Sequence, residues 1–223
     1  MTVDIDGMVL SRFVWRGEMW TDDPVLWHTA TIRCGGFRSY NFFNIDLTDI
    51  NHDRFECNEY DFIIDYTFPF GDVTVAPGVL HFSSPTNFFE PTTKITLQIK
   101  SALPFNPGLR IRVDPEKSSG SYFIFDFSNS FKVRKIPYPI NLYGSIGASQ
   151  PRYYRSYLDD QNKLTDILIG FNIPIDIGYG LTLSPAFEFT SLVEKSVRKA
   201  QEENHYDKDA FTYLVRIGRQ FSF

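Results

Sequence analysis

The residues best suited to covalent chemistry are a histidine and a serine two positions apart, His81 and Ser83, in the stretch VLHFSS. In an extended strand, residues i and i+2 lie on the same face, so these two side chains would be neighbours. Such a serine can act as a nucleophile when the histidine serves as its base and a third group orients the histidine. The stretch supplies no such third residue, and a strand that enters a loop is the favoured explanation, because a lone pair rarely makes a triad. We therefore expect no enzyme activity.

Signatures of bound cofactors or metals do not occur in the sequence. It contains no HExxH, P-loop or GxGxxG pattern. The two cysteines, Cys34 and Cys57, have neither the CxxC spacing nor the histidine cluster of a zinc site. The net charge of -5 argues against a nucleic-acid partner, which would require a basic surface. We expect no metal, no cofactor and no nucleic acid.

A second set of candidate functional residues is charged, and its members recur on the polar face of segments whose other face is apolar. The set comprises Arg12, Arg16, Lys94, Lys100, Arg110, Arg112 and Arg216, together with Asp46, Asp61, Asp65, Asp126 and Glu188. What these side chains could do depends on the elements that carry them.

Those elements are predicted to be strands, because apolar residues alternate with polar ones along most of the chain. In SYFIFDFSNSFKV, for example, Phe123, Phe125 and Phe127 share one face, while Asp126 and Ser128 share the other. The pattern predicts twelve such segments, at residues 3–15, 25–34, 38–48, 59–70, 73–82, 93–102, 108–114, 121–133, 139–148, 164–176, 180–192 and 210–223. Only KSVRKAQEENHYDKDA could contain a helical turn, and we interpret it as a solvated connection.

The connections between the predicted strands alternate between long and short. Tight turns such as RCGGF, PFGD and DIGYG alternate with longer segments such as TDINHDRFECNE and SSPTNFFEPT. In an up-and-down antiparallel sheet, alternate connections lie at the same end, so the long loops would gather at one end. DPEKSSG is short for a connection at the long-loop end.

An even number of two-faced antiparallel strands with long loops at one end is typical of an outer-membrane β-barrel. Lipid cannot hydrogen-bond to a backbone, so a membrane-spanning sheet must close on itself. We therefore predict an all-β fold, a single up-and-down antiparallel transmembrane β-barrel of about twelve strands that forms one domain over residues 1–223. The alternative is a soluble β-barrel or β-sandwich binding protein, whose strands would alternate in the same way.

Aromatic residues near strand ends favour the membrane barrel, because such barrels carry aromatic girdles at both interfaces. Trp15, Trp20, Trp27, Tyr60 and Tyr213 are predicted to belong to these girdles. The two cysteines are then predicted to be free thiols. Cys34 would lie at the short-turn end and Cys57 in a long loop, about 25 Å away across the lipid, whereas a disulfide needs Cα atoms within about 7 Å.

The final strand resembles the C-terminal recognition signal of bacterial outer-membrane proteins, in which alternating apolar residues end on phenylalanine. The resemblance assigns the signal to Tyr213, Val215, Ile217, Phe221 and Phe223. It implies that the outer-membrane assembly machinery is a partner. Arg219 departs from the pattern, because its position places a charge on the lipid face, where its head group could extend to the interface.

Two further stretches resemble the TorF-type porin family, whose substrate is unknown. SRFVWRGE (residues 11–18) is similar to that family's opening strand and loop, and VAPGVLHFSSP (residues 75–85) to a strand in the middle of its chain. In architecture alone, the chain is also similar to the 12-stranded channels for acidic oligosaccharides. The His81–Ser83 pair resembles outer-membrane phospholipases in spacing only, because their asparagine and surrounding motif are missing.

The resemblance implies a bacterial outer-membrane location and a bilayer as surroundings, and it gives the charged set a role as the lining of a lumen. One hypothesis is a porin-like channel for passive diffusion of small polar or anionic solutes, with Arg110 and Arg112 favouring anions. The same residues could instead form a structural network of ion pairs. A second hypothesis is a non-conducting barrel that anchors or joins an envelope complex, with loops such as SQPRYYRSYLDDQNK contacting other envelope proteins.

Overall fold

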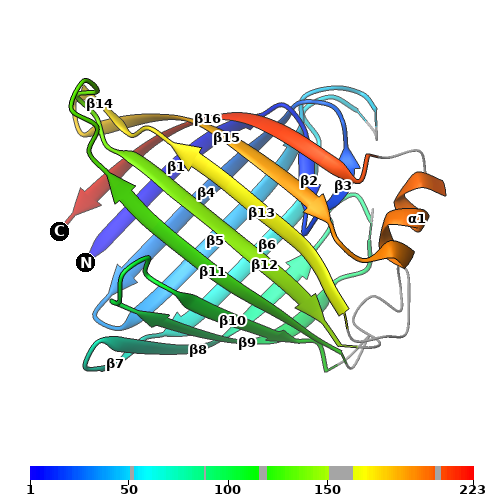
Figure 1. Cartoon of the computed structure of the whole chain (residues 1–223), viewed down its shortest axis with the longest axis horizontal. Helices are drawn as coiled ribbons and strands as arrows, with labels where there is room; N and C mark the ends of the chain where they lie inside the picture. Colours follow the sequence, from blue (N-terminus) through cyan, green and yellow to red (C-terminus); the bar gives the residue numbers. More distant parts are fainter. Residues whose placement is uncertain (51–52, 88, 116–119, 151–162, 204–206) are drawn as a thin grey trace.

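The computed structural model describes residues 1–50, 53–87, 89–115, 120–150, 163–203 and 207–223. Twelve long antiparallel strands in these ranges build the wall (Figure 1). They are β1 (Thr2–Leu10), β4 (Val25–Cys34), β5 (Phe37–Asp46), β6 (Cys57–Tyr66), β8 (Val73–Ser83), β9 (Thr92–Ser101), β10 (Gly108–Val113), β11 (Ser121–Phe131), β12 (Ile140–Ser149), β13 (Lys163–Asn172), β15 (Leu181–Leu192) and β16 (Asp209–Ser222).

Five shorter elements complete the described structure. Strands β7 (Phe68–Phe70) and β14 (Ile175–Gly178) follow β6 and β13 and pair with β8 and β15. Strands β2 (Phe13–Trp15) and β3 (Glu18–Thr21) pair only with each other in the described structure and form a separate hairpin. Helix α1 (Lys195–Glu203) lies in the connection between β15 and β16. No helix among the described residues is long and apolar enough to cross a membrane.

The wall closes into a barrel because each long strand pairs with its neighbour in the chain and β1 pairs with β16. At this seam Val3 lies opposite Phe221 and Val9 opposite Val215, in antiparallel register. The last step of the ring joins β13 to β15. Among the described residues, closure leaves the wall without an unpaired edge strand, which is the condition for a sheet surrounded by lipid. The predicted up-and-down barrel of twelve strands is confirmed.

The two ends of the barrel differ in their connections. Short connections, such as Gly35–Gly36 between β4 and β5, lie at the end that carries both termini (Figure 1). Most of the longer connections lie at the opposite end, together with β2, β3 and α1, although the β11–β12 connection at the first end is longer than the connection between β10 and β11. We call these the short-turn end and the long-loop end. Their separation confirms the predicted alternation of connection lengths.

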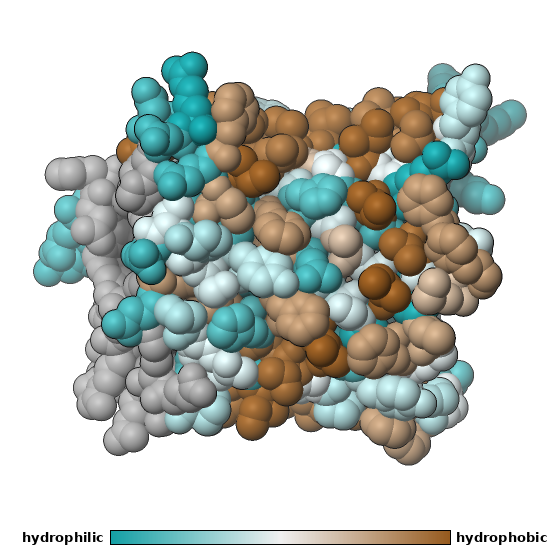
Figure 2. Space-filling model, turned by 180° about the vertical axis from the view of Figure 1, so that it is seen from behind, coloured by the Kyte–Doolittle hydropathy of each residue, from teal (hydrophilic) through white to brown (hydrophobic). Residues whose placement is uncertain are grey.

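The outer face of the barrel is rich in exposed apolar side chains. Examples are Ile5 on β1, Ile95 on β9, Ile169 on β13 and Val215 on β16, each between 42% and 57% exposed. Figure 2 shows apolar side chains spread over the visible surface, with polar ones among them. Such a surface suits a lipid environment, because its apolar groups gain nothing from contact with water.

Strand bounds agree with the predicted ones to within a few residues, with one exception. The first segment was predicted to run from residue 3 to residue 15, but β1 ends at Leu10. The chain then turns, and residues 13–21 form the β2–β3 hairpin. Alternation continues through this region because a hairpin strand also has two faces, so the pattern alone could not show the change of direction. Both cysteines are free thiols, as predicted.

Candidate functional site

The barrel lumen is lined by the polar members of each alternating strand, and three cavities along it are bordered by described residues. Seven residues of the predicted charged set line these cavities: Arg16, Asp61, Asp65, Arg110, Arg112, Glu188 and Arg216. The lumen therefore brings together charges that lie up to 200 positions apart in the sequence, from Arg16 to Arg216.

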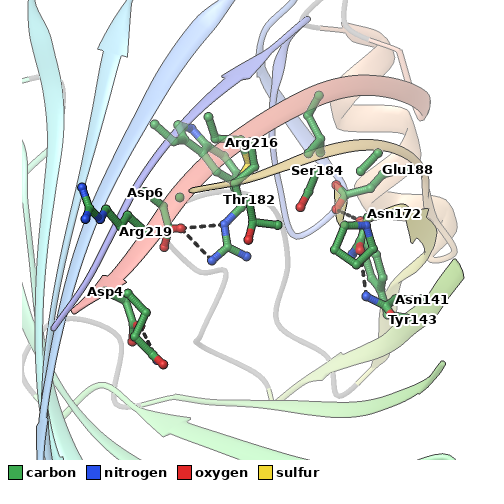
Figure 3. A pocket seen from close by; sticks show the side chains of 17 residues that line it. Asp4, Asp6, Asn141, Tyr143, Asn172, Thr182, Ser184, Glu188, Arg216 and Arg219 are labelled. Carbon is green, nitrogen blue, oxygen red and sulfur yellow. Dashed lines mark hydrogen bonds and ion pairs between the residues drawn. The ribbon is translucent and has the colours of Figure 1, made fainter. Parts of the chain in front are cut away.

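The largest of these three cavities has a volume of about 420 Å³ and lies beside the closing seam, between β1 and β12–β16. Its polar lining includes Asp6, Tyr143, Glu188 and Arg216 (Figure 3). Tyr143 donates a hydrogen bond to Glu188 Oε1 at 2.8 Å. Carboxylate, phenol and guanidinium groups at its surface make this cavity suitable for water and polar solutes.

Charges beside this cavity are paired across the seam. The Arg216 guanidinium donates to Asp6 Oδ1 through Nε at 2.9 Å and reaches the same oxygen with Nη2 at 2.8 Å. Thr29 donates to the other oxygen of Asp6 at 3.3 Å. Asp4 accepts a hydrogen bond from Gln220 at 2.6 Å and forms an ion pair with Arg33. These contacts join β1 to both of its neighbours, so they fix the seam as well as line the lumen.

The second cavity, about 210 Å³, lies against the opposite wall and is bordered by Arg38, Asp65, Arg110 and Arg112. Arg38 donates to Asp65 Oδ2 through Nε at 2.9 Å. Arg110 makes the same kind of bond to Asp126 Oδ2, also at 2.9 Å. Because Arg110 has its own carboxylate partner, the Arg110–Arg112 pair presents less net positive charge than its sequence suggests.

The third cavity, about 330 Å³, extends from the wall to the β2–β3 hairpin. Its lining includes Trp15, Arg16 and Gly17 from the hairpin, and Asp61 and Arg112 from the wall. The positive charges of Arg112, Lys94 and Arg16 all act on the Asp61 carboxylate. The cavity is therefore a mixed-charge region where the hairpin meets the wall.

The three tryptophans of the chain lie inside the barrel rather than in an outer girdle, which corrects the prediction for them. Trp15 and Trp20 belong to the hairpin, and Trp27 lines the lumen from β4. Phe13 packs between Trp20 and Trp27, with ring centroids 6.0 and 5.6 Å away. Tyr213 stays on the outer face, where it is 64% exposed. Aromatic content near strand ends did not reveal on which side of the wall each ring lies.

The other five predicted charged residues border none of these three cavities. Arg12 pairs with Asp22 at 2.9 Å in the connection that carries the hairpin. Asp46 is buried at the end of β5, and Asp126 pairs with Arg110. Lys94 is buried, with its ammonium 4.8 Å from the ring centroid of Phe82, whereas Lys100 is exposed near the end of β9.

Several polar residues of the lumen were absent from the predicted set. Asp4, Asp6, Arg38 and Tyr143 lie on the inner side of their strands and border the first two cavities. The signal was available, since each lies on the polar face of an alternating segment. Their partners could not be read from the sequence, because Asp6 and Arg216 are 210 positions apart and meet only at the closing seam.

The histidine and serine first considered for chemistry do not hydrogen-bond to each other in the described structure. His81 Nδ1 lies 3.2 Å from Thr93 Oγ1 on the neighbouring strand. Ser83 donates to the backbone oxygen of Tyr60 at 3.0 Å. Each side chain therefore has a partner on a strand next to β8, as expected for polar side chains within a sheet.

The chain matches no protein-family model and no curated protein. Among solved structures, it is similar to the KdgM porin, with a TM-score of 0.53 and 12% identity over 100% of this chain and 99% of the other. It is also similar to the NanC porin, with a TM-score of 0.52 and 14% identity over 99% and 100% of the two chains. A structure of the KdgM porin in complex with disordered oligogalacturonate gives the same TM-score and identity as the first. The shared property at these identities is the barrel fold.

Proposed function

We propose that this chain is a bacterial outer-membrane channel for passive diffusion of small polar solutes, anionic ones among them. The observation that carries the proposal is the contrast between an exposed apolar outer face and a lumen with three charge-lined cavities. A soluble binding protein would present the opposite arrangement, with its apolar face turned inward. The porin fold of the solved structures supports the proposal, and oligogalacturonate in the KdgM structure extends the candidate solutes to acidic saccharides.

Ion selectivity is proposed to be weak. Arg38, Arg110 and Arg216 each hold a carboxylate partner at 2.8–2.9 Å, so much of the lumen's positive charge is compensated. Arg16 and Arg112 make further contacts within the chain and border the third cavity together with Asp61, and we propose that this mixed-charge lining acts on a passing anion. No catalytic role is proposed for His81 and Ser83.

Planar-bilayer recording with the purified, refolded protein tests the channel. We expect discrete conductance steps and, under a salt gradient, a reversal potential close to zero. Folding would be checked beforehand by heat-modifiable migration on a denaturing gel. A folded barrel that gives no steps would contradict the channel, and strong cation selectivity would contradict the role given to Arg112.

A second candidate function is a non-conducting barrel that anchors or joins an envelope complex. The β2–β3 hairpin favours it, because its rings fill part of the lumen. The predicted contact loop SQPRYYRSYLDDQNK falls largely on residues 151–162, outside the described residues. Conductance steps from the intact protein would exclude this candidate.

Assembly and kinship are proposed on the evidence of particular segments. Tyr213, Val215, Ile217, Phe221 and Phe223 alternate along and just beyond β16, and all but Phe221 are among the exposed apolar side chains. We propose that they carry the assembly signal, with Arg219 stacked on Phe221 at 4.7 Å. We also propose kinship with the TorF-type porins, on the basis of SRFVWRGE and VAPGVLHFSSP. The first of these stretches begins just after β1 and runs through β2 to the start of β3.

A further inference from the structure

The β2–β3 hairpin crosses the lumen and contacts strands that lie far around the ring from its own attachment points. It begins after β1 and ends before β4, which are neighbours in the wall. Its Trp15 ring stacks on Phe82 of β8 at 6.1 Å between centroids. The Arg16 guanidinium lies 3.9 Å from the ring centroid of Tyr122 on β11. A segment with contacts on β8 and β11 extends across the barrel from the seam.

The tip of the hairpin fits closely against two more strands, β13 and β15. A Cβ atom placed on Gly17 would stand 2.9 Å from Asp166 Cβ and 2.7 Å from Leu192 Cδ2, distances that real Cβ contacts do not reach. Glycine is therefore the residue that allows this approach. We call Phe82, Tyr122, Asp166 and Leu192 the tip socket. Tyr122 donates a hydrogen bond to Asp166 within it.

The turn at the tip uses a backbone conformation that arginine rarely adopts. Arg16 and Gly17 have φ values of 52° and 80°, and Trp15 pairs with Glu18 across them. Positive φ at both central residues suits a two-residue hairpin turn, and asparagine or glycine is the usual choice. A residue with a Cβ atom, such as Arg16, is destabilised there because its Cβ comes too close to the backbone. Its guanidinium lies 4.1 Å from the Trp15 ring centroid and 3.9 Å from that of Tyr122, contacts that offset this cost.

Docking of the hairpin combines favourable and unfavourable terms. Phe13 and Met19 are 4% and 3% exposed, and removal of these apolar side chains from water favours docking. Against this, Glu18 is 3% exposed and its Oε1 has no hydrogen-bond partner among the described residues. A buried carboxylate oxygen without a partner is unfavourable. The stability of the docked hairpin is therefore the difference between favourable burial of Phe13 and Met19 and unfavourable burial of Glu18.

We propose that the β2–β3 hairpin is the gate of the lumen: its docked tip closes the long-loop half, and solute passes when the tip leaves the socket. The inference rests on the proposed channel function. Leu10 and Val25 already lie opposite each other in the β1–β4 ladder, so the gate is attached at one point of the rim and can move without breaking the wall. The third cavity then lies directly behind the gate.

Removal of the gate is the first test. Residues 12–23 are replaced by a short Gly-Ser turn that connects β1 to β4, and folding is verified by heat-modifiable migration. We expect single-channel conductance in potassium chloride to rise several-fold over the intact chain. Equal conductance of the two folded barrels would overturn the gate and leave the channel standing. Silence of both barrels would instead refute the channel itself.

Locking the gate is the second test. Gly17→Cys and Asp166→Cys are introduced together with Cys34→Ser and Cys57→Ser, since both native thiols are free. The two Cβ positions are 2.9 Å apart, and a small displacement reaches the roughly 3.5–4.5 Å of a disulfide. We expect the oxidised protein to lose conductance and a reductant to restore it. Undiminished conductance in the fully cross-linked protein would overturn the proposal.

A matched pair of glycine substitutions separates the tip contact from backbone strain. Gly17→Ala adds a methyl group that collides with the socket, whereas Gly35→Ala adds one in open space at a similar positive φ of 58°. We expect Gly17→Ala alone to raise conductance and to shift tryptophan emission to longer wavelength, because the three tryptophans lie in or beside the hairpin. The same response from both variants would contradict a specific role of the tip.

Discussion

The two halves of the lumen are held in different ways. From the short-turn end to the middle of the barrel, side chains of neighbouring strands pair with one another, as Asp4 does with Arg33 and Asp6 with Arg216. At the long-loop end, the hairpin brings rings and charges to strands that are not its neighbours, as Trp15 does to Phe82. Side-chain pairs within the wall can line a passage without blocking it. A segment that crosses the lumen lies in the path of a solute, so a solute can pass only beside it or after it has moved. Under the proposed gate, this difference assigns passage control to the long-loop end and any charge preference to the wall.

The largest expected effect comes from loss of the aromatic packing under the hairpin. Phe13→Ala removes a ring that is 4% exposed and packed against Trp20 and Trp27, and such a truncation costs about 3–5 kcal/mol. We expect the hairpin to undock, so conductance rises and tryptophan emission shifts to longer wavelength. Phe131→Ala, on the outer face at 41% exposure, is the control and should change neither. An unaltered emission spectrum in Phe13→Ala would show that the packing of Phe13 does not hold the hairpin in its docked position.

The pH dependence of docking is the next largest effect. Glu18 lies on the hairpin rather than on a spanning strand, and burial raises its pKa from 4.5 to about 7, assisted by Asp166 of β13 and opposed by the Arg16 charge and a hydrogen bond from Trp20. The docked form thus holds the proton more tightly than the exposed form. Docking is strongest below pH 4.5 and weakens as the pH rises through about 7.

Tryptophan emission and conductance, followed across that pH range, measure this effect. We expect both to report an opening gate as the pH rises. Glu18→Gln carries no titratable group, so its hairpin should stay docked throughout. A wild-type response that survives in Glu18→Gln would assign the pH dependence to another group.

Charge selectivity should respond to the other half of the lumen. Asp6→Asn removes the carboxylate that Arg216 contacts at 2.8 Å, and the loss costs about 1–3 kcal/mol of stability. The freed guanidinium should move the reversal potential toward anion selectivity while the single-channel conductance stays within the wild-type range. The double variant Asp6→Asn/Arg216→Gln restores neutrality and should return the wild-type potential. A reversal potential that ignores Asp6→Asn would show that the seam pair does not face the solute path.

The smallest expected effects come from two tyrosine hydroxyls that allow a direct comparison of the halves. Tyr122 donates to Asp166 in the tip socket, and Tyr143 donates to Glu188 in the largest cavity. Removal of either hydroxyl should cost about 1 kcal/mol, more where the partner is fully buried. We expect Tyr122→Phe to shift tryptophan emission slightly and Tyr143→Phe to leave it unchanged. The reverse order would weaken the division into two halves.

Much of the barrel could be predicted from the sequence because strand periodicity is local. Alternation along SYFIFDFSNSFKV depends only on neighbours in the chain, so it located β11 and separated its apolar face from Asp126. Connection lengths then gave the two ends. The lining of the lumen followed in part, since Arg112 and Glu188 lie on predicted polar faces and border cavities.

What the sequence determined by itself is the alternation of faces, the rhythm of loops and hence a closed sheet with an apolar exterior. The tertiary structure alone decided that the chain turns inward after Leu10 and that Gly17 reaches Asp166 and Leu192. A strand that continues and a hairpin that folds back have the same two-residue period. The choice between them depends on contacts with distant segments, from Phe82, which Trp15 meets, to Leu192, which Gly17 meets, and no local pattern records those contacts.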